Sequence, residues 1–129
     1  MNLFAPRRGA PLKATRELIA TVIAELRTAP VGDQFAILGP DDLTYVQTLL
    51  TTDGFVLQYQ EGSTEHHYES VRGDLTEPEV VEAFGAYLDG NAAWRWPFDW
   101  RQVEVRPVSY RLGHGIGRLL GRIFGRAGG

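Results

Sequence analysis

Cysteine is absent from this chain of 129 residues, and lysine occurs once, at Lys13. The absence of cysteine excludes disulfide bonds, thiolate metal ligands and cysteine nucleophiles. No run approaches the ~20 apolar residues that span a bilayer, and residues 1–11 lack the apolar stretch of a signal peptide. We therefore expect one globular domain in the cytoplasm, long enough to bury a single hydrophobic core.

Motifs that would mark a reaction are also missing. The glycine pattern at residues 113–117 departs from the dinucleotide-binding spacing, because Arg118 stands at the position of the third glycine. Lys13 follows no glycine-rich phosphate loop, and neither Ser63 nor Ser70 lies in the turn motif of a nucleophilic serine. The sequence therefore predicts no cofactor and identifies no enzyme class.

What the sequence does contain is charge sorted by position. Residues 31–100 carry thirteen acidic and two basic side chains, whereas residues 1–30 sum to +3 and residues 101–129 to +5. A charge distribution of this kind affects partner binding and solubility rather than the fold. We expect an acidic body that favours a basic protein partner and repels nucleic acid.

Hydrophobic periodicity predicts an α+β fold. Apolar residues recur at helical spacing over residues 14–28 and 75–88, and Thr76 with Glu79 forms the sequence signature of a capping box. Runs rich in β-branched and aromatic residues are joined by short turns, which favours an antiparallel meander. These runs cover residues 34–38, 43–51, 55–61 and 66–71.

From this order of elements we predict an antiparallel meander sheet of about four to five strands with two helices packed on one face. We assign residues 1–12 to an irregular N-terminal arm and residues 13–107 to a single α+β domain. Residues 108–129 form a basic, Gly/Arg-rich, amphipathic C-terminal tail, in which seven of the fifteen glycines fall.

An aromatic run contains all the tryptophan of the chain. Trp94, Trp96, Phe98 and Trp100 alternate with other residues, so an extended backbone would place the four rings on one side. The favoured interpretation is that they close the core beneath the second helix. The alternative is an exposed binding surface, and tryptophan at such surfaces is typical of protein interfaces.

A histidine–carboxylate patch is the one cluster that resembles metal or acid–base chemistry. On a strand, Glu65, His67 and Glu69 would face one way, and His66 and Tyr68 the other. Three convergent ligands could hold zinc. A strand that faces solvent shows the same alternation, so the three residues are weak metal candidates and His67 is a weak candidate for a general base.

The tail carries an apolar stripe at helical spacing, flanked by arginines and opposed by glycines. Each glycine inside a helix costs ~1 kcal/mol relative to alanine, so we expect a helix only where the stripe is buried. The tail could fold back on its own acidic body, which is favoured, or bind another protein or a second copy. An anionic membrane surface is a less favoured third partner. The stripe residues are Leu112, Ile116, Leu119, Leu120, Ile123 and Phe124.

The order of helix, meander and helix over residues 14–88 resembles the fold of secretion chaperones, in which a sheet flanked by helices binds a partner segment. The acidic body is similar in character to immunity proteins that neutralise basic toxins, and residues 55–100 resemble sequences of small bacterial proteins. These resemblances imply a non-enzymatic protein-interaction module. The alternative is a small ligand-binding protein or hydrolase-type enzyme that uses the aromatic run and the patch around His67.

Overall fold

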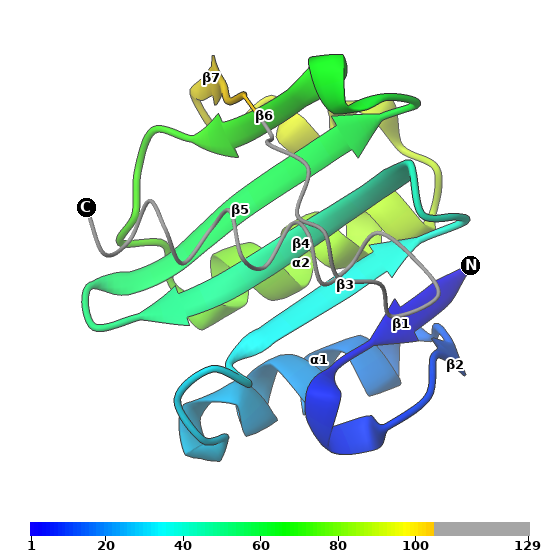
Figure 1. Ribbon diagram of the computed structural model, residues 1–129, viewed down its shortest axis with the longest axis vertical. Coiled ribbons are helices and arrows are strands. Elements are labelled where there is room, and N and C mark those ends of the chain that lie inside the picture. The colour runs from blue at the N-terminus through cyan, green and yellow to red at the C-terminus, as the bar shows by residue number, and fades with distance from the viewer. Residues whose placement is uncertain (105–129) are drawn as a thin grey trace.

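A computed structural model of the protein describes residues 1–104, and within them seven strands form one antiparallel sheet (Figure 1). Its order is β2-β1-β3-β4-β5-β6-β7. The four central strands follow one another in the chain and in the sheet, as the predicted meander requires. They are β3 (Phe35–Gly39), β4 (Thr44–Thr51), β5 (Gly54–Glu61) and β6 (His67–Ser70).

The edges of the sheet correct two expectations. Residues 1–12 are not an irregular arm, because β1 (Asn2–Phe4) pairs with β3 and places Leu3 opposite Leu38. β2 (Leu12–Lys13) then pairs with β1, and β7 (Trp100–Gln102) pairs with β6 at the other edge. Strands of two or three residues are too short to show a period of two in the sequence. The sheet therefore has seven strands rather than four to five.

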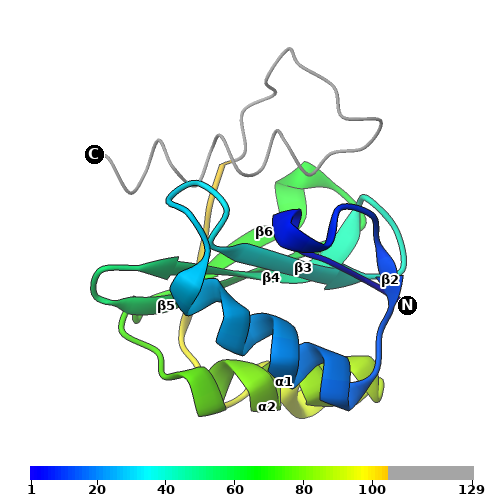
Figure 2. The same ribbon diagram turned by 90° about the horizontal axis from the view of Figure 1, so that it is seen from below.

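Both long helices pack on one face of the sheet, as predicted, and leave the other face to other contacts (Figure 2). They are α1 (Arg16–Glu25) and α2 (Glu77–Leu88). Ile19 and Ile23 of α1 and Phe84 of α2 are fully buried in the same hydrophobic cluster as Leu57 of β5. We call this side of the sheet the helix-covered face and the opposite side the second face.

The start of α2 is held at two points. The capping box is confirmed, since the Thr76 hydroxyl accepts from the Glu79 N–H at 3.3 Å and the Glu79 carboxylate accepts from the Thr76 N–H at 3.0 Å. Just before it, Leu75 exchanges two backbone hydrogen bonds with Phe55 of β5, at 2.9 and 3.1 Å. These contacts fix where α2 crosses the sheet.

The turn between β4 and β5 requires glycine. Gly54 has a φ of 141°, which side chains disfavour, and a Cβ there would lie 2.9 Å from the Cα of Asp74. The glycine thus allows the segment before α2 to approach the hairpin closely. Within residues 1–104 no helix is long and apolar enough to cross a membrane, and the predicted tail over residues 108–129 lies outside the described residues.

Candidate functional site

The aromatic run does not lie on one strand, so its four rings do not share a side. Ala92–Arg95 form the 3₁₀ helix η4, and only Trp100 lies in a strand. Trp94 is buried in the core, Phe98 and Trp100 are half-buried, and Trp96 is 78% exposed. Trp94 thus closes the core beneath α2, whereas Trp96 presents its ring to solvent.

Aromatic contacts fix the geometry of this region. The Tyr59 ring meets Trp94 at a centroid distance of 5.3 Å and Trp100 at 4.8 Å, both nearly edge-to-face. Tyr87 of α2 meets Trp94 at 5.4 Å in the same manner, and this arrangement suits aromatic quadrupoles. The Trp100 Nε1 group donates to the Arg95 carbonyl oxygen at 3.0 Å. The segment after α2 is therefore anchored on both α2 and β5.

Arg95, Tyr59 and Tyr87 keep their ordinary charge at neutral pH. Arg95 lies 5.1 Å from the Tyr59 ring centroid and donates to Glu61 at 3.0 Å, which raises the pKa of Arg95. Burial raises the pKa of Tyr59, and burial with the charges of Glu61 and Asp41 raises the pKa of Tyr87 to about 12. Neither phenol can therefore act as a phenolate base at neutral pH.

A pocket of about 420 Å³ lies between α2 and the segment that follows it. Glu79 and Glu82, one turn apart on α2, border this pocket. A hydrogen bond from the Thr76 N–H, with the contribution of Arg72, lowers the pKa of Glu79, so its carboxylate stays charged. Asn91 is the one other polar residue of the lining, and the remaining wall is apolar and comprises Pro78, Ala83, Ala86, Ala93, Trp94, Pro97 and Phe98.

Within residues 1–104, α1 and α2 both pack on the helix-covered face, whereas the second face carries a network of side-chain amides. Gln58 of β5 lies at its centre, where its Oε1 accepts from Gln47 Nε2 and its Nε2 donates to Glu69 Oε1, both at 2.8 Å. The other carboxylate oxygen of Glu69 accepts from Arg101 at 2.7 Å. This row crosses four strands, β4 to β7, because antiparallel register places these residues opposite one another.

His67 takes part in the same network. Gln58 donates its NH₂ group to Glu69, so its Oε1 faces His67. His67 Nε2 lies 3.0 Å from this oxygen. His67 Nδ1 lies 3.2 Å from Gln60 Oε1 and 3.5 Å from the Tyr45 hydroxyl. The network thus engages both ring nitrogens.

The three weak metal candidates do not converge. β6 begins at His67, so Glu65 lies in the 3₁₀ helix η3 (Thr64–His66) and is exposed, whereas His67 and Glu69 are buried on the second face. The expectation that all three alternate on one strand is wrong for Glu65, because the chain makes a helical turn before the strand starts. Among residues 1–104, no group of three His, Asp or Glu side chains is placed to hold a metal ion.

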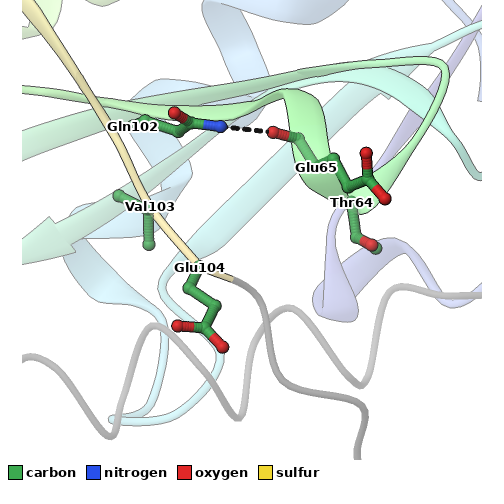
Figure 3. A pocket seen from close by; sticks show the side chains of 5 residues that line it. All are labelled: Thr64, Glu65, Gln102, Val103 and Glu104. Carbon is green, nitrogen blue, oxygen red and sulfur yellow. Dashed lines mark hydrogen bonds between the residues drawn. The ribbon is translucent and has the colours of Figure 1, made fainter.

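A second pocket, of about 550 Å³, lies where the described chain ends (Figure 3). Thr64 and Glu65 of η3 line it on one side, and residues 102–104 on the other. The Gln102 Nε2 group donates to the Glu65 carbonyl oxygen at 2.6 Å and joins the two sides. The Val103 N–H donates to the His67 carbonyl oxygen at 2.8 Å, so the chain remains attached to β6 up to this point.

Comparisons of the chain with protein-family models, with curated proteins and with solved structures find no match. Function must therefore be argued from the geometry alone. The predicted tail residues Leu112, Ile116, Leu119, Leu120, Ile123 and Phe124 lie outside the described residues.

The sequence interpretation missed the amide network. Alternation along β5 places Gln58 and Gln60 together on the side opposite Leu57, as the structure has them. The sequence does not connect them with Tyr45 and Gln47 of β4, because strand register is invisible in a single sequence. The available signal was neutral glutamine, rather than lysine or glutamate, at one position of β4 and two alternate positions of β5.

Proposed function

We propose that the protein is a non-enzymatic protein-interaction module that binds a basic, partly apolar segment of another protein. The observation that carries this proposal is the pocket beside α2, which combines an apolar wall with two carboxylates, Glu79 and Glu82. Lysine and arginine bury an apolar stem while their charged head stays near water. A pocket with this lining accommodates both parts of such a side chain.

The surroundings of the pocket support the same partner chemistry. Trp96, adjacent in the chain to the pocket residue Pro97, is the most exposed tryptophan of the protein at 78%. Exposed tryptophan is enriched among residues that dominate protein interfaces. The net charge of −11 over residues 31–100 would speed encounter with a basic partner in a salt-dependent manner.

The catalytic alternative finds less support in the described residues. His67 lies on the second face, away from α2, with both ring nitrogens in contact with Gln58 and Gln60. The pocket lining contains no histidine, serine or threonine. A general base must reach the proton that it abstracts, and nothing that lines the pocket beside α2, apart from its two carboxylates, could serve in that role.

Binding of defined peptides to the full chain tests the proposal. A fluorescein-labelled 12-residue peptide of alternating arginine and leucine should bind, as measured by anisotropy at low salt, and a glutamate–leucine peptide should not. Glu82→Lys should weaken binding of the basic peptide at least several-fold, since it reverses a charge at the pocket. Salt should weaken binding in the unmodified chain.

The matched control is Asp42→Lys, which makes the same change of charge in the exposed loop between β3 and β4, outside the pocket lining. An equal loss in both variants would mean that net charge alone attracts the peptide, and would refute the pocket as the site. Absence of binding by the basic peptide at low salt would refute the proposal as a whole.

A further inference from the structure

The second face of the sheet has the composition of a covered surface. At its apolar end Phe35, Ile37 and Leu49 are buried and pack with Tyr45 and Phe4. Along β3, β4 and β5 this face carries no charged side chain, because the polar residues that β4 and β5 present beside the apolar end are the glutamines of the amide network.

The low exposure of the glutamine side chains also indicates a covered surface. Gln47 is 1% exposed and Gln58 is 2% exposed, although α1 and α2 both lie on the other side of the sheet (Figure 2). Burial of neutral amides costs little free energy when they are hydrogen-bonded to one another. Burial of unpaired amides would cost much more. The network thus prepares the face for contact with another segment.

We propose that the second face is a docking site and that its occupant is the segment 108–126 of the same chain. This inference does not depend on the pocket beside α2, which lies on the helix-covered side. The docking proposal and the proposed peptide-binding function can therefore be refuted separately.

The place where the described chain ends supports this occupant. Residues 102–104 line the pocket beside η3 (Figure 3). The Val103 N–H donates a hydrogen bond to the carbonyl oxygen of His67 in β6, one of the strands of the network. From β7 to β1 the sheet spans five strand spacings, about 24 Å. Nineteen residues wound as a helix measure about 28 Å. The segment is thus long enough to cross the whole face from the edge at which it starts.

Chemical complementarity supports it as well. The stripe from Leu112 to Phe124 supplies apolar side chains of the kind that the Phe35–Leu49 end of the face would bury. Residues 105–129 carry five arginines and no acidic residue. Glu65 and Glu104 stand at the rim where the segment would begin. Burial of the stripe on this face would also offset the cost of its glycines, which disfavour a helix in water.

Paramagnetic relaxation in the full chain tests the proposal, and the absence of native cysteine allows a single label. A nitroxide attached through Gly125→Cys should broaden the side-chain NH₂ signals of Gln47, Gln58 and Gln60, which lie on the second face. It should leave the NH₂ signal of Asn91, which caps η4 near α2, unaffected. Equal broadening of both groups, or of neither, would overturn the proposal.

Mixing distinguishes the source of the segment. A ¹⁵N-enriched chain without nitroxide is mixed with a ¹⁴N chain that carries the nitroxide. The glutamine signals of the ¹⁵N chain should stay sharp if the contact is within one molecule. Broadening in the mixture would show that a second copy occupies the face, and would overturn the assignment to the same chain.

A pair of matched double variants tests the apolar stripe. Leu119→Asp with Ile123→Asp should abolish the broadening of the glutamine signals, because it places two carboxylates on the stripe. Gly117→Asp with Gly121→Asp makes the same change of charge on the opposite side of the predicted helix and should retain the broadening. If the glutamine signals stay broadened in the Leu119→Asp, Ile123→Asp variant, and the signals from the core around Phe84 are unchanged, the docking mode is refuted.

Discussion

Leu57 and Gln58 are adjacent in β5, yet they are buried by different chemistry. Leu57 is fully buried among the apolar side chains of α1 and α2, while Gln58 is 2% exposed within a row of amides and one ion pair. Apolar packing is non-directional and tolerates changes of neighbour. Hydrogen bonds need a defined partner at a defined place. Leu57 is therefore held by apolar burial, whereas the partners of Gln58 depend on the register of the strands.

The largest effect is expected on the helix-covered face. Phe84→Ala removes a fully buried ring from α2, and such truncations cost about 3–5 kcal/mol through lost burial and the cavity left behind. Urea unfolding followed by circular dichroism measures the free energy of unfolding. A cost as small as that of a surface substitution would mean that the helix layer contributes less than its burial implies.

A smaller effect is expected from the centre of the second face. Gln58→Leu removes the partner of Gln47, His67 and Glu69 at once, and unsatisfied buried polar groups cost about 1–3 kcal/mol. The same unfolding measurement gives this value. The control is Gln34→Leu, whose amide donates to the Leu26 carbonyl oxygen outside the network. If Gln34→Leu lowers the free energy of unfolding as much as Gln58→Leu does, the amide network contributes no more to stability than a single hydrogen bond outside it.

The difference between the faces also explains what the sequence could predict. Both helices, the cap at Thr76 and all four central strands follow from periodicity and turn residues, which act over a few positions. β1 and β7 could not be predicted, since each exists only through its pairing with a strand already in the sheet. The amide network was hidden for a related reason: Gln47 and Gln58 are eleven positions apart and meet only through register.

The aromatic run shows the same limit within a short segment. Alternation of rings over residues 94–100 suggested an extended strand, but the Asn91 side chain caps a helical turn by accepting from the Ala93 N–H at 3.0 Å. That turn buries Trp94 and exposes Trp96. A local cap and the tertiary contacts of Tyr59 and Tyr87 thus override the pattern.

The two tryptophans of this turn separate stability from binding. Trp96→Ala should change the free energy of unfolding by no more than about 0.5 kcal/mol, as for other exposed sites, and should weaken the basic peptide. Trp94→Ala should cost about 3–5 kcal/mol, because its ring lies in the core. Unfolding curves and peptide anisotropy on the same samples give both values. A stability loss in Trp96→Ala without a loss of peptide binding would contradict the assignment of Trp96 to the interface.

The smallest expected effect concerns the charge of Glu79 at the border of the pocket. Its folded pKa is lowered from the ordinary value of 4.5, chiefly by the Thr76 N–H. Its contribution to stability is therefore complete above the unfolded pKa and is lost as the pH falls through the folded pKa. Glu79→Gln keeps an oxygen that can accept from Thr76 but cannot titrate, so its unfolding free energy should fall less steeply below pH 4.5. Identical acid slopes in the two proteins would show that the cap does not depend on the charge of Glu79.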